Sequence, residues 1–304
     1  MAQLWSQTRK NESRMNAELL CDGLHFGEGP RWHEGKLWFS DFYDHAVKTV
    51  DAKGNVATML AVAGQPSGLG WLPDGNMLVV SMLDRQVLRL DDDQLVVHAD
   101  LSAVAEFHCN DMVVDAVGRA YVGNFGFDLH GAERSDNFAA QLKAYAGATL
   151  ARVDLDGSVH VAATALQFPN GAVISPDGRT LIVAETLASQ LTAFDVADDG
   201  TLRNQRPWAK LARGVAPDGI CLDADGAIWV ADAIAPRCLR VGQGGEVLAE
   251  VATEQNCYAC MLGGEDGRTL FMLTASDSHP DIASVNRTGK ILTTTVPVGH
   301  AGRP

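Results

Sequence analysis

The chain has 304 residues, of which 46% are hydrophobic, and its formal net charge is −14. Nucleic acids and anionic membranes bind basic surfaces, so this charge argues against both as partners. No apolar run is long enough to span a bilayer, and the six scattered cysteines fit a reducing cytoplasm.

The N-terminal segment 1–16 is polar and lacks the hydrophobic stretch of a secretory signal. We expect it to be a poorly ordered tail in front of one domain that spans 17–304. The strand-like segment 17–22 (AELLCD) follows the tail. A ring of strands leaves an open edge unless its ends meet, so we expect this segment beside the last repeat of the chain.

From residue 27 onward, a unit of four strand-like runs occurs six times. A tight turn that ends in glycine follows the first run of each unit, at Gly35, Gly75, Gly118, Gly178, Gly226 and Gly267. A period near 40 to 45 residues with four strands is typical of a β-propeller. The sequence therefore predicts an all-β fold, a six-bladed propeller with four-stranded antiparallel blades. In the sixth unit, the third and fourth runs are expected at 281–286 and 291–296.

One spacing between turn glycines is 60 residues, which adds about 17 residues between Asn124 and Thr149. Long loops within compact domains are usually functional. This insertion joins the second and third strands of the third unit, on the face where the first strands begin. We expect a lid over the mouth of the central channel, with an inert surface insertion as the alternative.

Side chains that carry oxygen recur at the same position in most of the repeats. Counting back eight residues from the turn glycine, or seven in the first unit, gives Glu28, Ser67, Asn110, Asn170, Asp218 and Ala259. The first strand of each blade lines the channel of a propeller, so these positions form a ring. The carboxylates of Glu28 and Asp218 would repel each other without a cation between them. Oxygen ligands suit Ca²⁺, Mg²⁺ or Mn²⁺, whereas the alternative is that these residues only cap turns.

Other chemistry has less support in the sequence. Cys257 and Cys260 form a C-x-x-C pair, but no second pair completes a zinc site, so we expect both thiols in the core. The sequence contains neither a G-x-S-x-G elbow nor an H-E-x-x-H motif, which leaves serine hydrolase and zincin mechanisms unsupported.

Four motifs together resemble those of the SMP-30/gluconolactonase/regucalcin-like family of six-bladed propellers, which includes bacterial lactonases. They are GEGPRW (27–32), NDMVVDAVG (110–118), PNGAVISPDG (169–178) and PDGICLDADG (217–226), and the resemblance covers 17–296. It implies that Glu28, Asn170 and Asp218 are metal ligands and that Asn110 contacts substrate and water.

The implied activity is hydrolysis of a small-molecule lactone, with one divalent cation polarising the carbonyl and Asp218 accepting a proton from water. Ca²⁺ is favoured, and Zn²⁺, Mn²⁺, Mg²⁺ and iron are alternatives. A phosphotriesterase using the same site and a non-catalytic propeller scaffold remain competing hypotheses.

The chain departs from the family at His108, where the sugar-lactone members commonly carry an arginine that contacts substrate hydroxyls. We therefore assign His108 to substrate binding. A single imidazole cannot replace the fork of donors on a guanidinium. Together with the apolar residues of the insertion, this predicts a substrate less polar than a sugar lactone.

Overall fold

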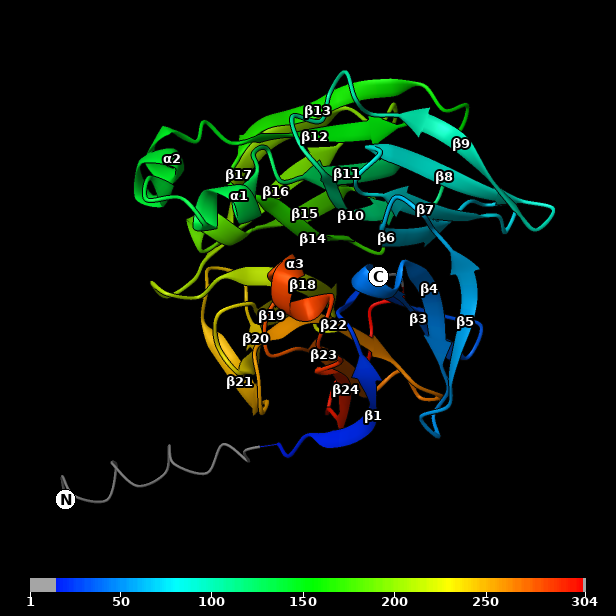
Figure 1. Ribbon diagram of the computed structural model, residues 1–304, viewed down its shortest axis with the longest axis vertical. Coiled ribbons are helices and arrows are strands. Elements are labelled where there is room, and N and C mark those ends of the chain that lie inside the picture. The colour runs from blue at the N-terminus through cyan, green and yellow to red at the C-terminus, as the bar shows by residue number, and fades with distance from the viewer. Residues whose placement is uncertain (1–14, 303–304) are drawn as a thin grey trace.

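The computed structural model describes residues 15–302. The predicted tail, 1–16, lies outside the described residues except for Met15 and Asn16. Six four-stranded antiparallel sheets stand in a ring, which confirms the predicted six-bladed propeller (Figure 1). Within the described range, no helix is both long and apolar enough to cross a membrane.

The first five blades follow the chain without interruption. Blade one comprises β2 (Gly27–His33), β3 (Lys36–Asp41), β4 (Ala46–Val50) and β5 (Val56–Ala61), and blade two comprises β6 (Pro66–Trp71), β7 (Met77–Ser81), β8 (Gln86–Asp91) and β9 (Gln94–Asp100). Blade three comprises β10 (Cys109–Val114), β11 (Ala120–Asn124), β12 (Ala148–Val153) and β13 (Val159–Leu166), and blade four comprises β14 (Pro169–Ile174), β15 (Thr180–Glu185), β16 (Gln190–Val196) and β17 (Leu202–Lys210). Blade five comprises β18 (Pro217–Leu222), β19 (Ile228–Asp232), β20 (Arg237–Val241) and β21 (Val247–Ala252).

Blade six is built from both ends of the described chain. Its strands are β22 (Cys257–Gly263), β23 (Thr269–Thr274), β24 (Gly289–Thr295) and, outermost, β1 (Glu18–Leu24), which pairs antiparallel with β24. The expectation that 17–22 lies beside the last repeat is therefore confirmed.

The predicted strand at 281–286 is wrong. Pro280 opens the short helix α3 (Pro280–Ala283), whose first N–H group is bonded by the side chain of His279 at the N-cap. Proline fits the first turn of a helix and cannot donate to a sheet ladder, which explains why this segment leaves the blade. The run predicted as the fourth strand is consequently the third, β24.

The innermost strands β2, β6, β10, β14, β18 and β22 contact one another in sequence around the ring. In every blade the register between the first and second strands shifts at one point. The extra residue at such a bulge changes the direction in which a side chain points. The glycine after the aimed residue makes room for the next blade. A Cβ atom on Gly171 would lie 2.6 Å from the backbone nitrogen of Ile220, and one on Gly219 would lie 2.7 Å from Cα of Ala259.

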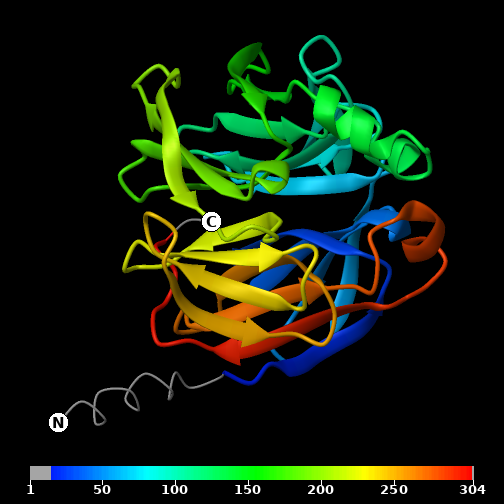
Figure 2. The ribbon, with the colours of Figure 1, turned by 90° about the vertical axis from the view of Figure 1, so that its left-hand side faces the viewer.

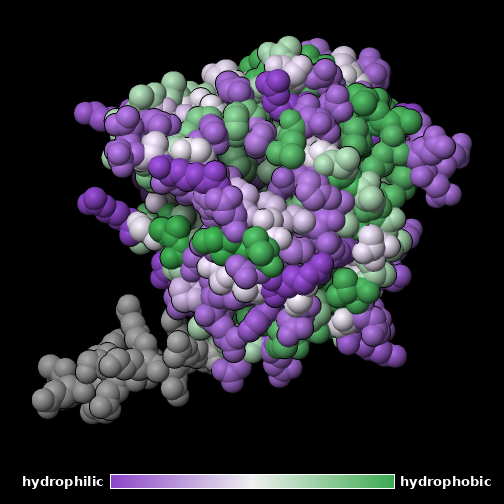
Figure 3. Space-filling view, in the orientation of Figure 1, coloured by the Kyte–Doolittle hydropathy of each residue, from purple (hydrophilic) through white to green (hydrophobic). Residues whose placement is uncertain are grey.

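Apolar side chains fill the spaces between neighbouring blades. Val173 and Ile182 of blade four, for example, pack in one buried cluster with Ile220 and Val230 of blade five. The face drawn in Figure 3 is mostly hydrophilic, with apolar stretches where Figure 1 places β5 and β9. The ring thus buries its apolar residues between sheets, which leaves the channel free for polar groups.

The blade-three insertion (residues 125–147) joins β11 to β12 and contains two short helices, α1 (Leu129–Glu133) and α2 (Phe138–Ala144). Figure 2 shows these helices and α3, which lies between β23 and β24, on the same side of the molecule. Connections from blades three and six therefore share the end of the ring at which the first strands begin.

Candidate functional site

A cavity of about 570 Å³ opens at the end of the ring where the first strands begin. Every site residue expected from the sequence lines it: Glu28, His108, Asn110, Asn170 and Asp218. The four ring residues are 6% or 7% exposed. They lie within strands, at or next to the shifts of register, and the glycines that follow Glu28, Asn170 and Asp218 serve the close approach of blades. The alternative that they only cap turns is therefore wrong.

Hydrogen bonds fix the orientation of the Asn170 side chain. The hydroxyl of Thr186 donates to the carbonyl of Pro217 at 2.8 Å, so it must accept from Asn170 Nδ2, which lies 3.2 Å away. The Asn170 side chain also lies close enough to the Asp218 carboxyl to lower its pKa. With its amide nitrogen engaged in this way, Asn170 Oδ1 remains available as a ligand.

The two ring carboxylates are buried without a matching positive charge. Burial, opposed by a hydrogen bond from the Gly29 amide, raises the pKa of Glu28 to about 8. Burial first, and then the charges of Glu28 and Asp111, raise the pKa of Asp218 well above its usual range. A divalent cation between them would reverse both effects. Two carboxylates and an amide oxygen form a ligand set that fits a hard cation.

A third carboxylate near the ring, that of Asp111, escaped the sequence analysis. Its pKa is raised by burial and lowered by Arg31, whose Nη2 lies 2.9 Å from Asp111 Oδ1. Both side chains are buried, at 4% exposed for Arg31 and 7% for Asp111. Arg31 therefore pairs with Asp111, and its charge is only a minor influence on the pKa of Glu28 beside burial. Arg31 stands three residues after Glu28 and Asp111 directly after Asn110 in the quoted motifs, but only the fold shows that they pair.

His108 is half-buried in the pocket wall and stacks on Phe107, with ring centroids 4.0 Å apart. Burial lowers its pKa, so the ring is neutral near pH 7. A neutral imidazole offers one donor and one acceptor, which is fewer polar contacts than an arginine would provide.

The walls of the pocket are largely aromatic. A buried cluster in contact with the cavity comprises Phe26, Phe42, Met82, Phe125, Phe168 and Tyr258. Counting back from Gly267 predicted Ala259 at the ring position of blade six, but Tyr258 occupies that position. The register shift in blade six falls between Cys257 and Ala259, so Tyr258 rather than Ala259 reaches the pocket. None of the described residues that line this cavity is an arginine or a lysine.

Two carboxylates at the ends of second strands have structural roles. Glu185 accepts a hydrogen bond from the Gln167 amide at 2.7 Å, and Asp232 accepts one from the Ala216 amide at 3.1 Å. Each holds the chain that enters the first strand of its blade, and neither lines the cavity. The thiols of Cys257 and Cys260 are buried in the core, as expected.

The blade-three insertion covers the cavity, in agreement with the expected lid. Leu129, His130 and Glu133 of α1 and Phe138 and Leu142 of α2 contribute to the lining. We call the insertion, together with 278–283 of the β23–β24 connection, the roof of the pocket, and we call the ring residues its floor. The two helices were not anticipated, because each is shorter than two turns and leaves no long periodic pattern.

Comparisons with known proteins identify the family of this chain. The family model described as the SMP-30/Gluconolactonase/LRE-like region matches residues 26–276. The chain is 25% identical to a 6-deoxy-6-sulfogluconolactonase of Pseudomonas putida, over 95% of this chain and 99% of the relative. It is 26% identical to regucalcin of Xenopus laevis, over 85% of this chain and 86% of the relative.

Solved structures share the fold at lower identity. A gluconolactonase of Xanthomonas campestris superposes with a TM-score of 0.71 at 22% identity, covering 91% of this chain and 89% of that one. A calcium-binding regucalcin of Agrobacterium tumefaciens has a TM-score of 0.75 at 20% identity, covering 95% and 97%. The family model spans most of the chain, and this protein therefore belongs to the SMP-30/gluconolactonase/LRE-like family.

Proposed function

We propose that the protein is a metal-dependent lactonase whose substrate is a neutral lactone with few hydroxyl groups. The observation that carries the proposal is the contrast within one pocket. Its floor holds two uncompensated buried carboxylates and two amides, and its walls are aromatic and aliphatic. Family membership and the names of the relatives support the reaction class.

Glu28, Asn170 and Asp218 would hold the cation, which fits Ca²⁺ best among the divalent ions. When bound, the cation supplies Lewis acidity to the lactone carbonyl and acidity to water. It also restores the charged form of both carboxylates, since a nearby positive charge lowers the pKa that burial has raised.

Asp218 is the carboxylate that we assign as the base, because it lines the floor next to the Asn170 side chain, which interacts with its carboxyl. It accepts the proton of the attacking water, and that proton then passes to the ring oxygen that leaves as the alcohol. Asn110 lies on the same floor with a free amide group, and it orients the water and the substrate carbonyl. The aromatic walls exclude bulk water, which strengthens each of these polar contacts.

The lining also supports a choice of substrate. The Pseudomonas putida relative is named for a sulfonated sugar lactone. Recognition of a sulfonate calls for arginine or lysine, and the lining contains neither among its described residues. Each polyol hydroxyl left unpaired against an aromatic wall would cost about 1 to 3 kcal/mol. Burying alkyl carbon there would instead gain roughly 25 cal/mol per Å².

A kinetic panel tests the proposal. The purified protein, treated with EDTA and reloaded separately with Ca²⁺, Mn²⁺ and Zn²⁺, would be assayed on alkyl- and aryl-substituted lactones, on glucono- and xylonolactone, and on an aryl phosphotriester. We expect metal-dependent hydrolysis, with kcat/KM at least tenfold higher for the apolar lactones than for the sugar lactones. A tenfold preference for sugar lactones would overturn the substrate assignment. Hydrolysis of the phosphotriester alone would overturn the reaction class.

A further inference from the structure

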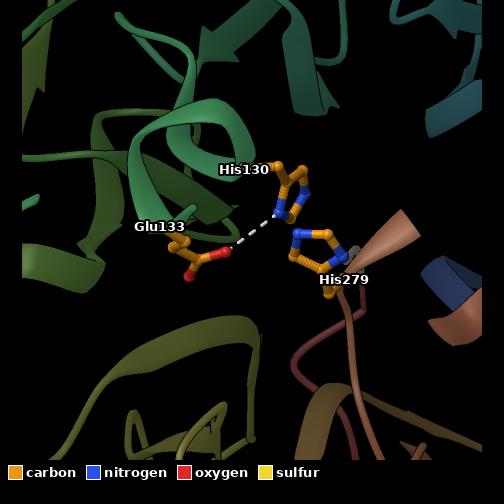
Figure 4. Close-up of side chains that lie close together, drawn as sticks. All are labelled: His130, Glu133 and His279. Atoms are coloured by element: carbon orange, nitrogen blue, oxygen red, sulfur yellow. Dashed lines mark hydrogen bonds and ion pairs between the residues drawn. The ribbon is translucent and has the colours of Figure 1, made fainter. Parts of the chain in front are cut away.

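Three potential metal ligands meet at the roof of the pocket, away from the floor. His130 and Glu133, three residues apart on α1, face His279 from the segment before α3 (Figure 4). One ligand atom from each lies within 4.8 Å of the others. His130 Nδ1 and Glu133 Oε2 are 3.2 Å apart. The side chains are 23%, 38% and 18% exposed in that order, so solvent ions can reach them.

We propose that His130, Glu133 and His279 form a second divalent-cation site, selective for Zn²⁺, that ties the blade-three insertion to the β23–β24 connection. Two imidazoles and a carboxylate are a typical ligand set for zinc, with a fourth position left for water. The floor, in contrast, offers only oxygen atoms. The floor would therefore prefer hard cations, and the site in the roof would prefer borderline cations such as Zn²⁺.

His279 has a carboxylate within reach of its outer ring nitrogen. Its Nδ1 accepts a hydrogen bond from the backbone amide of Asp281 at 3.2 Å, so its Nε2 is the nitrogen directed toward α1. Metal on Nε2 would place the ring proton on Nδ1, and the bond from the Asp281 amide would then be lost. Asp281 Oδ2, 4.0 Å from Nδ1, is the carboxylate in place to accept that proton after a small rotation.

Arg134 is the group that a cation must displace. Its Nε lies 3.2 Å from His279 Nε2, while its Nη2 pairs with Asp281 Oδ2 at 2.5 Å. The second contact can persist when the first is lost, so Arg134 moves only a short way. The carboxylates of Glu133 and Asp281 outnumber the one guanidinium, which leaves the cluster with a net negative charge for a dication.

Occupancy would link blades three and six across the pocket mouth. His130 and Glu133 line the cavity, and His279 belongs to the β23–β24 connection of blade six. In the metal-free cluster, the only described polar links are solvent-exposed contacts of Arg134, which contribute little. A zinc ion would hold the same two segments through coordinate bonds and slow their separation.

Zinc binding to the full-length protein, preloaded with Ca²⁺ at the floor, tests the site by competition with a chromophoric chelator. We expect one Zn²⁺ per chain. Loss of an outer partner of a metal site typically costs about 10- to 100-fold in affinity. Asp281→Asn should fall in that range, and His279→Ala or Glu133→Gln should exceed it. His160→Ala is the matched control, because His160 lies in β13, outside the roof, where it pairs with Asp154 at 3.0 Å. This variant should bind zinc like the wild type.

Hydrogen exchange of residues 126–145 provides a second readout. Zinc should slow exchange in the wild type and not in His279→Ala. Equal zinc affinity of His279→Ala and wild type, or an anomalous scattering peak confined to the floor in zinc-soaked crystals, would overturn the proposal. Neither measurement uses lactone hydrolysis, so failure of the proposed reaction would be recognised separately.

Discussion

The floor and the roof of the pocket are built in opposite ways. The floor residues sit on bulged innermost strands, are at most 7% exposed, and are held by the close approach of neighbouring blades. The roof residues sit on helices of four to seven residues in two connections, and the proposed zinc ligands are 18% to 38% exposed. Rigid elements position reacting groups more accurately than loops do, whereas loops can change without cost to the scaffold. The comparison assigns the chemistry to the floor and the selection of substrate to the roof.

The largest effect should come from the floor. Asp218→Asn removes a ligand charge and the proposed base, so lactone hydrolysis should fall by about 10⁴-fold or more, the upper range for a general base. Metal content, measured by ICP on purified protein, should fall with it. Asn110→Ala is the comparison variant, because it should lose activity and keep the metal. Equal metal loss in both variants would show that the division of roles is wrong.

Removal of the metal should make the stability of the floor depend on pH. In metal-free protein the pKa of Glu28 is raised from 4.5 to about 8, so the folded state favours the protonated carboxyl. Its contribution is fully present below about pH 4.5 and is lost as the pH rises through about 8. Urea unfolding should show a loss on the order of 3 to 5 kcal/mol over this window, the usual scale for an uncompensated buried charge. A pH-independent difference between metal-free and Ca²⁺-loaded protein would contradict the pKa shift.

The close packing between blades that supports the floor can be disrupted without changing the proposed metal ligands. Gly171→Ala places a Cβ atom 2.6 Å from the backbone of the next blade, where no side chain can yield. We expect a loss of about 1 to 3 kcal/mol in stability, seen as a lower midpoint of thermal unfolding. Gly242→Ala is the control, since its Cβ atom would meet only Leu248 at an ordinary 3.5 Å. Similar midpoints for the two variants would mean that the blades tolerate more space than the structure indicates.

The role of the roof in selection is tested by the double variant Phe138→Ala/Leu142→Ala. Both side chains line the cavity and lie far in the sequence from the floor ligands. The loss of apolar contact should raise KM for alkyl lactones about tenfold while kcat changes little, because such contacts act on bound substrate and transition state alike. KM for gluconolactone should stay constant. A fall in kcat for both substrates would give the roof a part in the reaction itself.

The smallest effect should follow from Arg134→Gln. Its ion pair with Asp281 joins the two halves of the roof, but the side chains are 53% and 69% exposed. Such a pair contributes about 0.2 to 1 kcal/mol, so exchange of residues 126–145 should rise only severalfold. Zinc should abolish this difference between variant and wild type. A persistent difference with zinc bound would show that the cation does not join the two segments.

The sequence was sufficient to predict the ring and four of the polar side chains that line its cavity. The Asn-Gly pair of blade four and the Asp-Gly pair of blade five mark β-bulges. Such a bulge depends on neighbouring residues, so it recurs at the same position of the repeat. Blade six broke the rule, since its register shift falls at Tyr258 rather than at the counted position Ala259. The length of the turn after the first strand does not indicate where the register between the first and second strands shifts.

The remaining site residues depend on contacts between distant segments. Arg31 and Asp111 are 80 positions apart, and Arg134 and His279 are 145 apart. A single sequence carries no signal of such pairs. The helix α3 was not predicted, because residues 281–286 alternate as a strand does, whereas Pro280 at the first helical position keeps the segment out of the sheet.

The pairing of β1 with β24 sets the order in which the molecule can be completed during synthesis. Glu18 pairs with Thr293, so β1 must wait for almost the whole chain to be translated, roughly 15 to 55 seconds at ribosomal rates. During this interval β1 presents an unpaired edge that other nascent chains could join. Glu18 and Asp22 place two negative charges on the unpaired β1. These charges disfavour pairing with other chains until β24 has been synthesised and pairs with β1.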